Sequence, residues 1–227
     1  MELEEKIRSV VNEILDSIKD KKMRDLVKSK TFLTGGCFKA LFHNEEVNDY
    51  DFYFVDEKSI KLFEKLIHDG LCKPRTKAFT DIKKFYLKDL KHKSEFAITF
   101  MLNKTIKVQF ITKYFGSPTK VTNNFDFEHV KNYYVPALDV FNINYDVLSS
   151  KELIFNVGAS HPINALKRMQ KFIKQGWTIN DPEIMKIAES INNLDLDSPG
   201  EYKEQSSGMY LYTESIMRGY NSKRSVG

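Results

Sequence analysis

Residues 32–54 read FLTGGCFKALFHNEEVNDYDFYF, and the fold that we expect follows from this stretch. A short β-prone run leads to Gly35-Gly36, a short helical segment follows, and a strand carrying Asp49 and Asp51 comes next. Glycine lets the backbone approach a ligand closely, and the free amides at the start of a helix attract anions. Alternation along a strand places both carboxylates on one face, about 7 Å apart. Carboxylates in this arrangement can hold magnesium ions against the phosphates of a nucleoside triphosphate (NTP).

Each half of this pattern also has an ordinary structural explanation. A Gly-Gly pair is usually a turn, and an isolated Asp-x-Asp on a strand is more often solvated than bound to metal. The two halves in this order, on these elements, favour a nucleotide site over either explanation.

The same stretch resembles the active-site motif of the nucleotidyltransferase superfamily of the DNA polymerase β type. More narrowly, residues 35–51, GGCFKALFHNEEVNDYD, resemble the GGxVRDxLLGxxxxDxD motif of CCA-adding enzymes and bacterial poly(A) polymerases, without a gap. The resemblance implies that Gly35 and Gly36 contact the triphosphate and that Asp49 and Asp51 bind the metal ions. It also implies an α+β fold, in which a small, palm-like mixed sheet is followed by a helical neck-like region.

The chain departs from the family motif directly after the glycines. The family's Arg-Asp is replaced by Lys39-Ala40. Lys39 can still meet a phosphate, although only as a point charge without the guanidinium fork, and we include it among the nucleotide-binding residues. Ala40 cannot supply the acid, so any positioning role of that carboxylate is absent.

A third catalytic acid is harder to place. Many members of the superfamily carry one on a later strand, beside the Asp-x-Asp strand, and in IKVQFIT the expected place is occupied by the neutral Gln109. Asp126 in NFDFEH is the other candidate, in a stretch with a faint similarity to the family's RDFTxNA motif. The alternative for Asp126 is capping at the end of a buried strand.

A second, fainter resemblance lies in HPINALKRMQKFIKQGWTI, residues 161–179. It is similar to the family segment DPLRxLRxxRFxxxxGF, which links the catalytic half to the neck. By this resemblance Arg168 would lie near the triphosphate or an RNA backbone. A solvated basic helix face explains Arg168 equally well, and explains Lys171 better.

Hydrophobic periodicity predicts a mixed first half and a helical second half. We expect a catalytic domain over 1–148 and a helical region over 149–227, ending in a tail that is loosely held from residue 195. The expected helices cover residues 3–18, 37–42, 59–71 and 163–173, and a further helix follows Asn180. The expected strands cover residues 31–34, 49–55, 96–102 and 106–112, the last two forming a hairpin through 103–105. Residues 117–124 are expected to form a loop.

Composition excludes several classes of protein. The 227 residues are 41% hydrophobic and 13% aromatic with a net charge of +4, which favours a folded chain over a disordered one. The two cysteines, Cys37 and Cys72, have no metal-binding spacing and indicate neither a disulfide framework nor a zinc site. No apolar run is long enough to span a membrane, and the charged N-terminus is unlike a signal peptide, so we expect a cytoplasmic protein.

We therefore expect a magnesium-dependent enzyme that moves a nucleoside monophosphate from NTP to a hydroxyl, with the 3′ end of tRNA as the acceptor that the family implies. The chain stops near the neck of those enzymes, so another RNA, a protein or a small molecule stays open as acceptor. The alternative is a catalytically silent nucleotidyltransferase fold used for binding or assembly, which Lys39-Ala40 and Gln109 favour. A toxin that modifies tRNA would share the chemistry and differ only in its acceptor.

Overall fold

The computed structural model describes residues 2–72, 90–94, 96–102 and 106–198, together with residues 200 and 205. The chain divides into two compact units. The first comprises Met1–Asn123 and His129–Ser150, and the second comprises Asn124–Glu128 and Lys151–Gly227. The domain limits 1–148 and 149–227 remain a proposal. The loosely held tail lies almost entirely outside the described residues, as does the turn expected at 103–105.

The first unit combines helices with a mixed sheet, which is the α+β class that the sequence predicts. Its helices are α1 (Leu3–Ser17), α2 (Lys21–Lys30), α3 (Cys37–Phe42), α4 (Glu57–Cys72), α6 (Pro118–Thr122) and α7 (Tyr145–Ser150). Its strands are β1 (Thr31–Thr34), β2 (Tyr50–Phe54), β3 (Leu90–Lys93), β4 (Ala97–Leu102), β5 (Ile106–Phe115), β6 (Tyr133–Val135) and β7 (Val140–Asn142).

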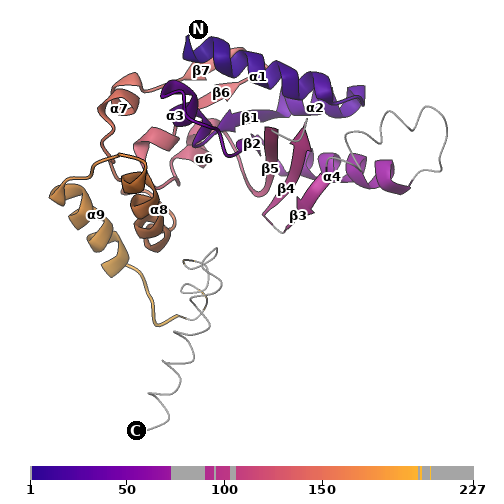
Figure 1. The fold of residues 1–227 in the computed structure, drawn as a ribbon. Helices are drawn as coiled ribbons and strands as arrows, with labels where there is room; N and C mark the ends of the chain where they lie inside the picture. Colours follow the sequence, from indigo (N-terminus) through magenta and orange to yellow (C-terminus); the bar gives the residue numbers. More distant parts are fainter. Residues whose placement is uncertain are drawn as a thin grey trace. The chain divides into compact units, whose positions relative to one another are not determined.

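Among the described residues, seven strands form one sheet in the order β3-β4-β5-β2-β1-β6-β7 (Figure 1). Only β2 and β5 pair in parallel in this part of the chain, and the other neighbouring strands pair antiparallel. The expected β4–β5 hairpin has the antiparallel pairing that was predicted. β2, which carries Asp51 and begins one residue after Asp49, therefore lies between β1 and β5 in the interior of the sheet.

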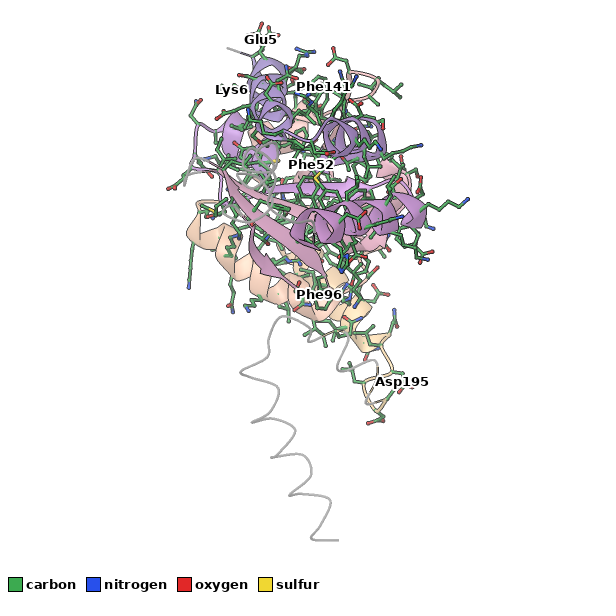
Figure 2. All side chains as sticks on the ribbon, turned by 90° about the vertical axis from the view of Figure 1, so that its right-hand side faces the viewer. Glu5, Lys6, Phe52, Phe96, Phe141 and Asp195 are labelled. Carbon is green, nitrogen blue, oxygen red and sulfur yellow. The ribbon has the colours of Figure 1, made fainter. Side chains whose placement is uncertain are left out.

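One face of the sheet forms the main core with α1, α2 and α4. Along β2, Tyr50, Phe52 and Phe54 are buried, whereas Asp51 is half-buried. The ring of Phe52 stacks on Phe110 of β5 with 5.5 Å between their centroids, and Figure 2 shows Phe52 in the interior with side chains around it. Because side chains alternate along a strand, Asp51 is turned to the opposite face of the sheet.

Residues 117–124 do not form the predicted loop, because α6 occupies most of them. Ser117 is the N-cap, and its hydroxyl accepts a hydrogen bond from the Lys120 amide at 3.3 Å. Pro118 follows at the first helical position, where its fixed φ suits a helix and its missing N–H is not needed. The prediction was wrong because a five-residue helix has too few apolar positions to show a period.

The second unit contains α8 (Pro162–Lys174) and α9 (Asp181–Asn192), and the 3₁₀ turn η2 (Glu128–Val130) begins in it. Both helices were predicted, and Asn180 caps α9 by accepting a hydrogen bond from the Glu183 amide at 3.0 Å. An aromatic group forms the core of this unit and consists of Phe127, Phe155, Phe172 and Trp177. In the described part of the chain, no helix is both long and apolar enough to cross a bilayer.

Candidate nucleotide and metal site

The glycine turn after β1 lies directly against Asp51. Gly35 has φ of +96°, a backbone conformation that a residue with a side chain rarely adopts. A Cβ atom at Gly35 would lie 3.3 Å from Oδ2 of Asp51. Gly36 then caps α3 with an ordinary φ of −68°, and a Cβ there would meet nothing within 4 Å. Gly35 thus allows the backbone to approach the carboxylate, while Gly36 faces open space.

A polar row crosses the sheet at the level of Asp51. Thr34 on β1, Asp51 on β2, Gln109 on β5 and Thr99 on β4 are successive partners in the strand register. The Gln109 amide donates to the Thr99 hydroxyl at 3.3 Å, and the Thr34 hydroxyl donates to the Asn132 carbonyl at 2.7 Å. The partner of Asp51 on the parallel strand β5 is therefore Gln109, whose side-chain amide already donates a hydrogen bond to Thr99 of β4.

Asp49 precedes β2 by one residue and has a cationic neighbour. The Lys107 ammonium lies 3.3 Å from Oδ2 of Asp49, and the two side chains are 39% and 33% exposed. Lys107 stands two residues before Gln109 on β5, so the pleat places both on the face of Asp51. We did not single out Lys107 from the sequence. Its spacing from Gln109 was the signal that could have identified it.

Cys37, the first residue of α3, lies near the same two acids. Its thiol is buried, and burial raises its pKa well above the usual value, with further increases from Asp51 and then Asp49. A thiol with a raised pKa stays protonated at neutral pH and is a poor nucleophile. Cys37 packs in the hydrophobic core of the first unit.

Lys39, predicted to meet a phosphate, is only 5% exposed. Its ammonium lies 2.6 Å from a carboxylate oxygen of Glu45. The buried His129 is nearby, and its pKa is lowered to about 3, first by burial and then by the charge of Lys39. Contact between Lys39 and a phosphate stays a prediction, since the ammonium is engaged with Glu45 inside the first unit.

Asp126 and Arg168 belong to the second unit and bind each other there. The guanidinium Nη1 of Arg168 donates to Oδ2 of Asp126, whose side chain is 2% exposed. Burial raises the pKa of Asp126, and the charge of Arg168 opposes this increase. The predicted roles of Asp126 as a third acid and of Arg168 as a phosphate or RNA ligand stay predictions. Within their unit the two form a charge-assisted hydrogen bond.

The two carboxylates of the Asp-x-Asp sequence are the candidates for holding a divalent cation. Asp49 and Asp51 are oxygen ligands of the kind that Mg²⁺ prefers. In the described ranges, however, no cluster of three His, Cys, Asp or Glu side chains suited to a metal ion occurs. Gln109 stands where the strand register would bring a further side chain to Asp51, and its amide is a neutral group.

The sequence is related to proteins of a named family. Residues 3–152 match the family model described as "Gad2: Gabija anti-defense 2 family protein". A protein of Bacillus phage SPbetaL7 named "Gabija anti-defense 2" is 28% identical over 190 residues, which cover 82% of this chain and 43% of that protein. The chain thus spans less than half the length of this curated relative.

Solved structures similar to this chain include CCA-adding enzymes. One in complex with ATP gives a TM-score of 0.55 at 12% identity, covering 87% of this chain and 46% of the other. Another from Thermotoga maritima, complexed with tRNA, gives 0.48 at 13% identity, covering 80% and 45%. The first similarity shows that the chain has a fold of the nucleotidyltransferase type.

Proposed function

Because this chain belongs to the Gabija anti-defense 2 family, we propose that it acts against that defence through an NTP site on its nucleotidyltransferase fold. The proposed activity is magnesium-dependent transfer of a nucleoside monophosphate to a hydroxyl, with RNA as the expected acceptor. One observation supports this proposal most strongly, namely that a Cβ atom at Gly35 would lie only 3.3 Å from Oδ2 of Asp51, so that the absence of a side chain leaves the space beside this carboxylate open.

In the proposed arrangement, each residue acts through its position. Gly35 and Gly36 leave the backbone accessible to the triphosphate, and Asp49 and Asp51 hold the cation that accompanies it. When bound, Mg²⁺ would offset the negative charge of the phosphates and of the departing pyrophosphate. The acceptor oxygen bonds to the α-phosphorus in line, the bond to the β-phosphate oxygen breaks, and the hydroxyl proton passes to water. Pyrophosphate leaves with the bonding electrons.

A catalytically silent nucleotidyltransferase fold used for binding or assembly is the second candidate, and the residues around the two acids favour it. Lys107 forms an ion pair with Asp49, and Gln109 is the register partner of Asp51. The strand next to the acids therefore presents a cation and a neutral amide to them, and no further acid. Ala40 also lacks the acid of the related motif. Such a module would transfer nothing and would have no need to bind NTP with magnesium.

The transferase and the silent module are distinguished by incubating the protein with each of four α-labelled NTPs, magnesium and total RNA. The transferase predicts that label enters RNA with the wild type and not with Asp49→Asn/Asp51→Asn. Glu46→Gln, in which an exposed carboxylate of the preceding loop is neutralised, serves as the matched control and should keep full incorporation. Folded wild type that labels neither RNA, protein nor small molecules, and that does not bind NTP in magnesium, would favour the silent module.

If the labelled RNA is tRNA, growth on expression separates the remaining possibilities. A toxin would arrest the host, and Asp51→Asn would relieve the arrest. A protein that acts against the defence alone would leave growth of cells lacking Gabija unchanged.

A further inference from the structure

We propose that the candidate site takes a single divalent cation together with the NTP, and that the ammonium of Lys107 supplies the second positive charge. This inference rests on the NTP binding of the proposed function. It applies to the transferase, because the silent module has no need to bind NTP.

The position of Lys107 is the first reason. Its Nζ is 3.3 Å from Oδ2 of Asp49, a distance at which an ammonium bonds to a carboxylate. Both side chains are about one-third exposed, so the pair lies at an accessible edge and not in the core. Oδ2 of Asp49 is thus already engaged by a cation of the protein itself.

The position of Gln109 is the second reason. In the parallel β2–β5 register Gln109 is the partner of Asp51, and its amide nitrogen donates to Thr99 at 3.3 Å. That hydrogen bond turns the amide toward β4 and leaves one neutral oxygen as the only ligand that Gln109 can offer. At the position that pairs with Asp51, β5 therefore presents no negatively charged side chain.

The charge balance of the four side chains is the third reason. Asp49 and Asp51 contribute −2, Lys107 contributes +1 and Gln109 contributes nothing, so the net formal charge is −1. Two divalent cations within about 4 Å of each other require several anionic ligands to offset their repulsion. The triphosphate brings negative charge for any number of cations, so the protein's own carboxylate ligands set the limit, and Asp51 with an Asp49 that is paired to Lys107 suits one cation whose remaining ligands are phosphate oxygens and water.

Counting bound Mn²⁺ tests this inference without relying on activity. Mn²⁺ replaces Mg²⁺, free Mn²⁺ is measured by electron paramagnetic resonance, and a non-hydrolysable ATP analogue is present in excess. We expect one Mn²⁺ per wild-type chain and two per chain of Lys107→Met/Gln109→Asp, whose four side chains sum to −3. Lys113→Met, a change at an exposed lysine further along β5, is the control and should still bind one.

A single variant keeps the inference testable if the double variant does not fold. Lys107→Met alone removes the cation beside Asp49 and is expected to tighten binding of the first Mn²⁺ about tenfold, the effect of one nearby charge on a carboxylate. Unchanged Mn²⁺ affinity in this folded variant would overturn the role of Lys107.

The remaining outcomes separate this inference from the proposed function. Two Mn²⁺ in the wild type, or one in a folded double variant, would overturn the inference and leave NTP binding standing. Absence of both Mn²⁺ and the ATP analogue from the folded wild type and all variants would instead remove the proposed function on which the inference rests.

Discussion

At the scale of single residues, the candidate site is defined by the closeness of Asp51 to the position that a Cβ atom at Gly35 would occupy. The distance of 3.3 Å from a Cβ at Gly35 to Oδ2 of Asp51 is tighter than most side chains allow, and the φ of +96° adds backbone strain. Gly36 has neither constraint. Replacing Gly35 by alanine should therefore destabilise the fold, whereas replacing Gly36 should not. The sequence alone does not distinguish the two glycines.

Gly35→Ala should accordingly destabilise the fold by roughly 1–3 kcal/mol, the usual cost of a non-glycine residue in such a conformation, and displace Asp51. Urea unfolding and NTP binding measure the two effects. Gly36→Ala is the matched control for stability and should leave the unfolding free energy nearly unchanged, since a Cβ there meets nothing within 4 Å. Equal behaviour of the two alanine variants would contradict the assigned contact.

His129 gives a pH dependence whose sign follows from its burial. Its folded-state pKa is lowered to about 3 from the ordinary 6.5, first by burial and then by Lys39. Between these values the unfolded chain binds a proton at His129 and the folded chain does not. Stability should therefore fall as the pH falls from about 6.5 toward 3.

The expected contribution of His129 is roughly 1 kcal/mol of unfolding free energy for each pH unit in that window. Because carboxylates also titrate there, the quantity to compare is the slope for wild type against that for His129→Gln. The variant should have the shallower slope. Parallel profiles would show that His129 is charged in the folded protein or exposed to water.

At the scale of elements, β1, α3 and β2 could be predicted because each has a local signal. Alternating β-formers mark the strands, and the glycine pair marks the break before the helix. Strands β6 and β7 have three residues each and α7 has six, so none shows a full period. Their existence depends on pairing with distant residues, such as Leu33 with Tyr134, which a local pattern does not contain.

The strand that carries Lys107 and Gln109 is held in place by Phe110. Its ring lies 5.5 Å from that of Phe52, 4.7 Å from Phe63 and 5.8 Å from Phe100, measured between centroids. We expect Phe110→Ala to lower the unfolding free energy by roughly 3–5 kcal/mol, the range for emptying a buried aromatic site.

Phe115 on the same strand is 39% exposed and provides the control for this measurement. Phe115→Ala should cost much less in chemical denaturation, since little apolar surface is returned to water. If Phe115→Ala lowered the unfolding free energy as much as Phe110→Ala, the core would not lie where the structure places it.

At the scale of the whole molecule, the fold resembles that of one group of proteins, whereas the family is named for another role. The motif in residues 35–51 resembles that of CCA-adding enzymes, and similarity to a solved CCA-adding enzyme confirms the fold. The family is nevertheless Gabija anti-defense 2, which the motif did not indicate. In the proposed function, the glycine turn and the two acids hold the triphosphate, whereas the acceptor and the biological role depend on other surfaces.

The family assignment predicts a result in cells. Phage plating on a host that carries Gabija should rise when this chain is expressed, if the part of the relatives that it spans is sufficient. Asp49→Asn/Asp51→Asn at equal expression should abolish the increase, because the proposed action requires the NTP site. Full protection by that variant would separate the anti-defence role from the site.

NTP binding at the Asp-x-Asp strand is the central claim, and calorimetric titration of each NTP with and without magnesium tests it most directly. The wild type and Glu46→Gln should bind an NTP in magnesium and lose most of that affinity in excess chelator. Asp51→Asn should bind at least tenfold more weakly in magnesium and show little response to the chelator. Equal binding by wild type and Asp51→Asn, or no binding of any NTP by folded wild type, would contradict the claim.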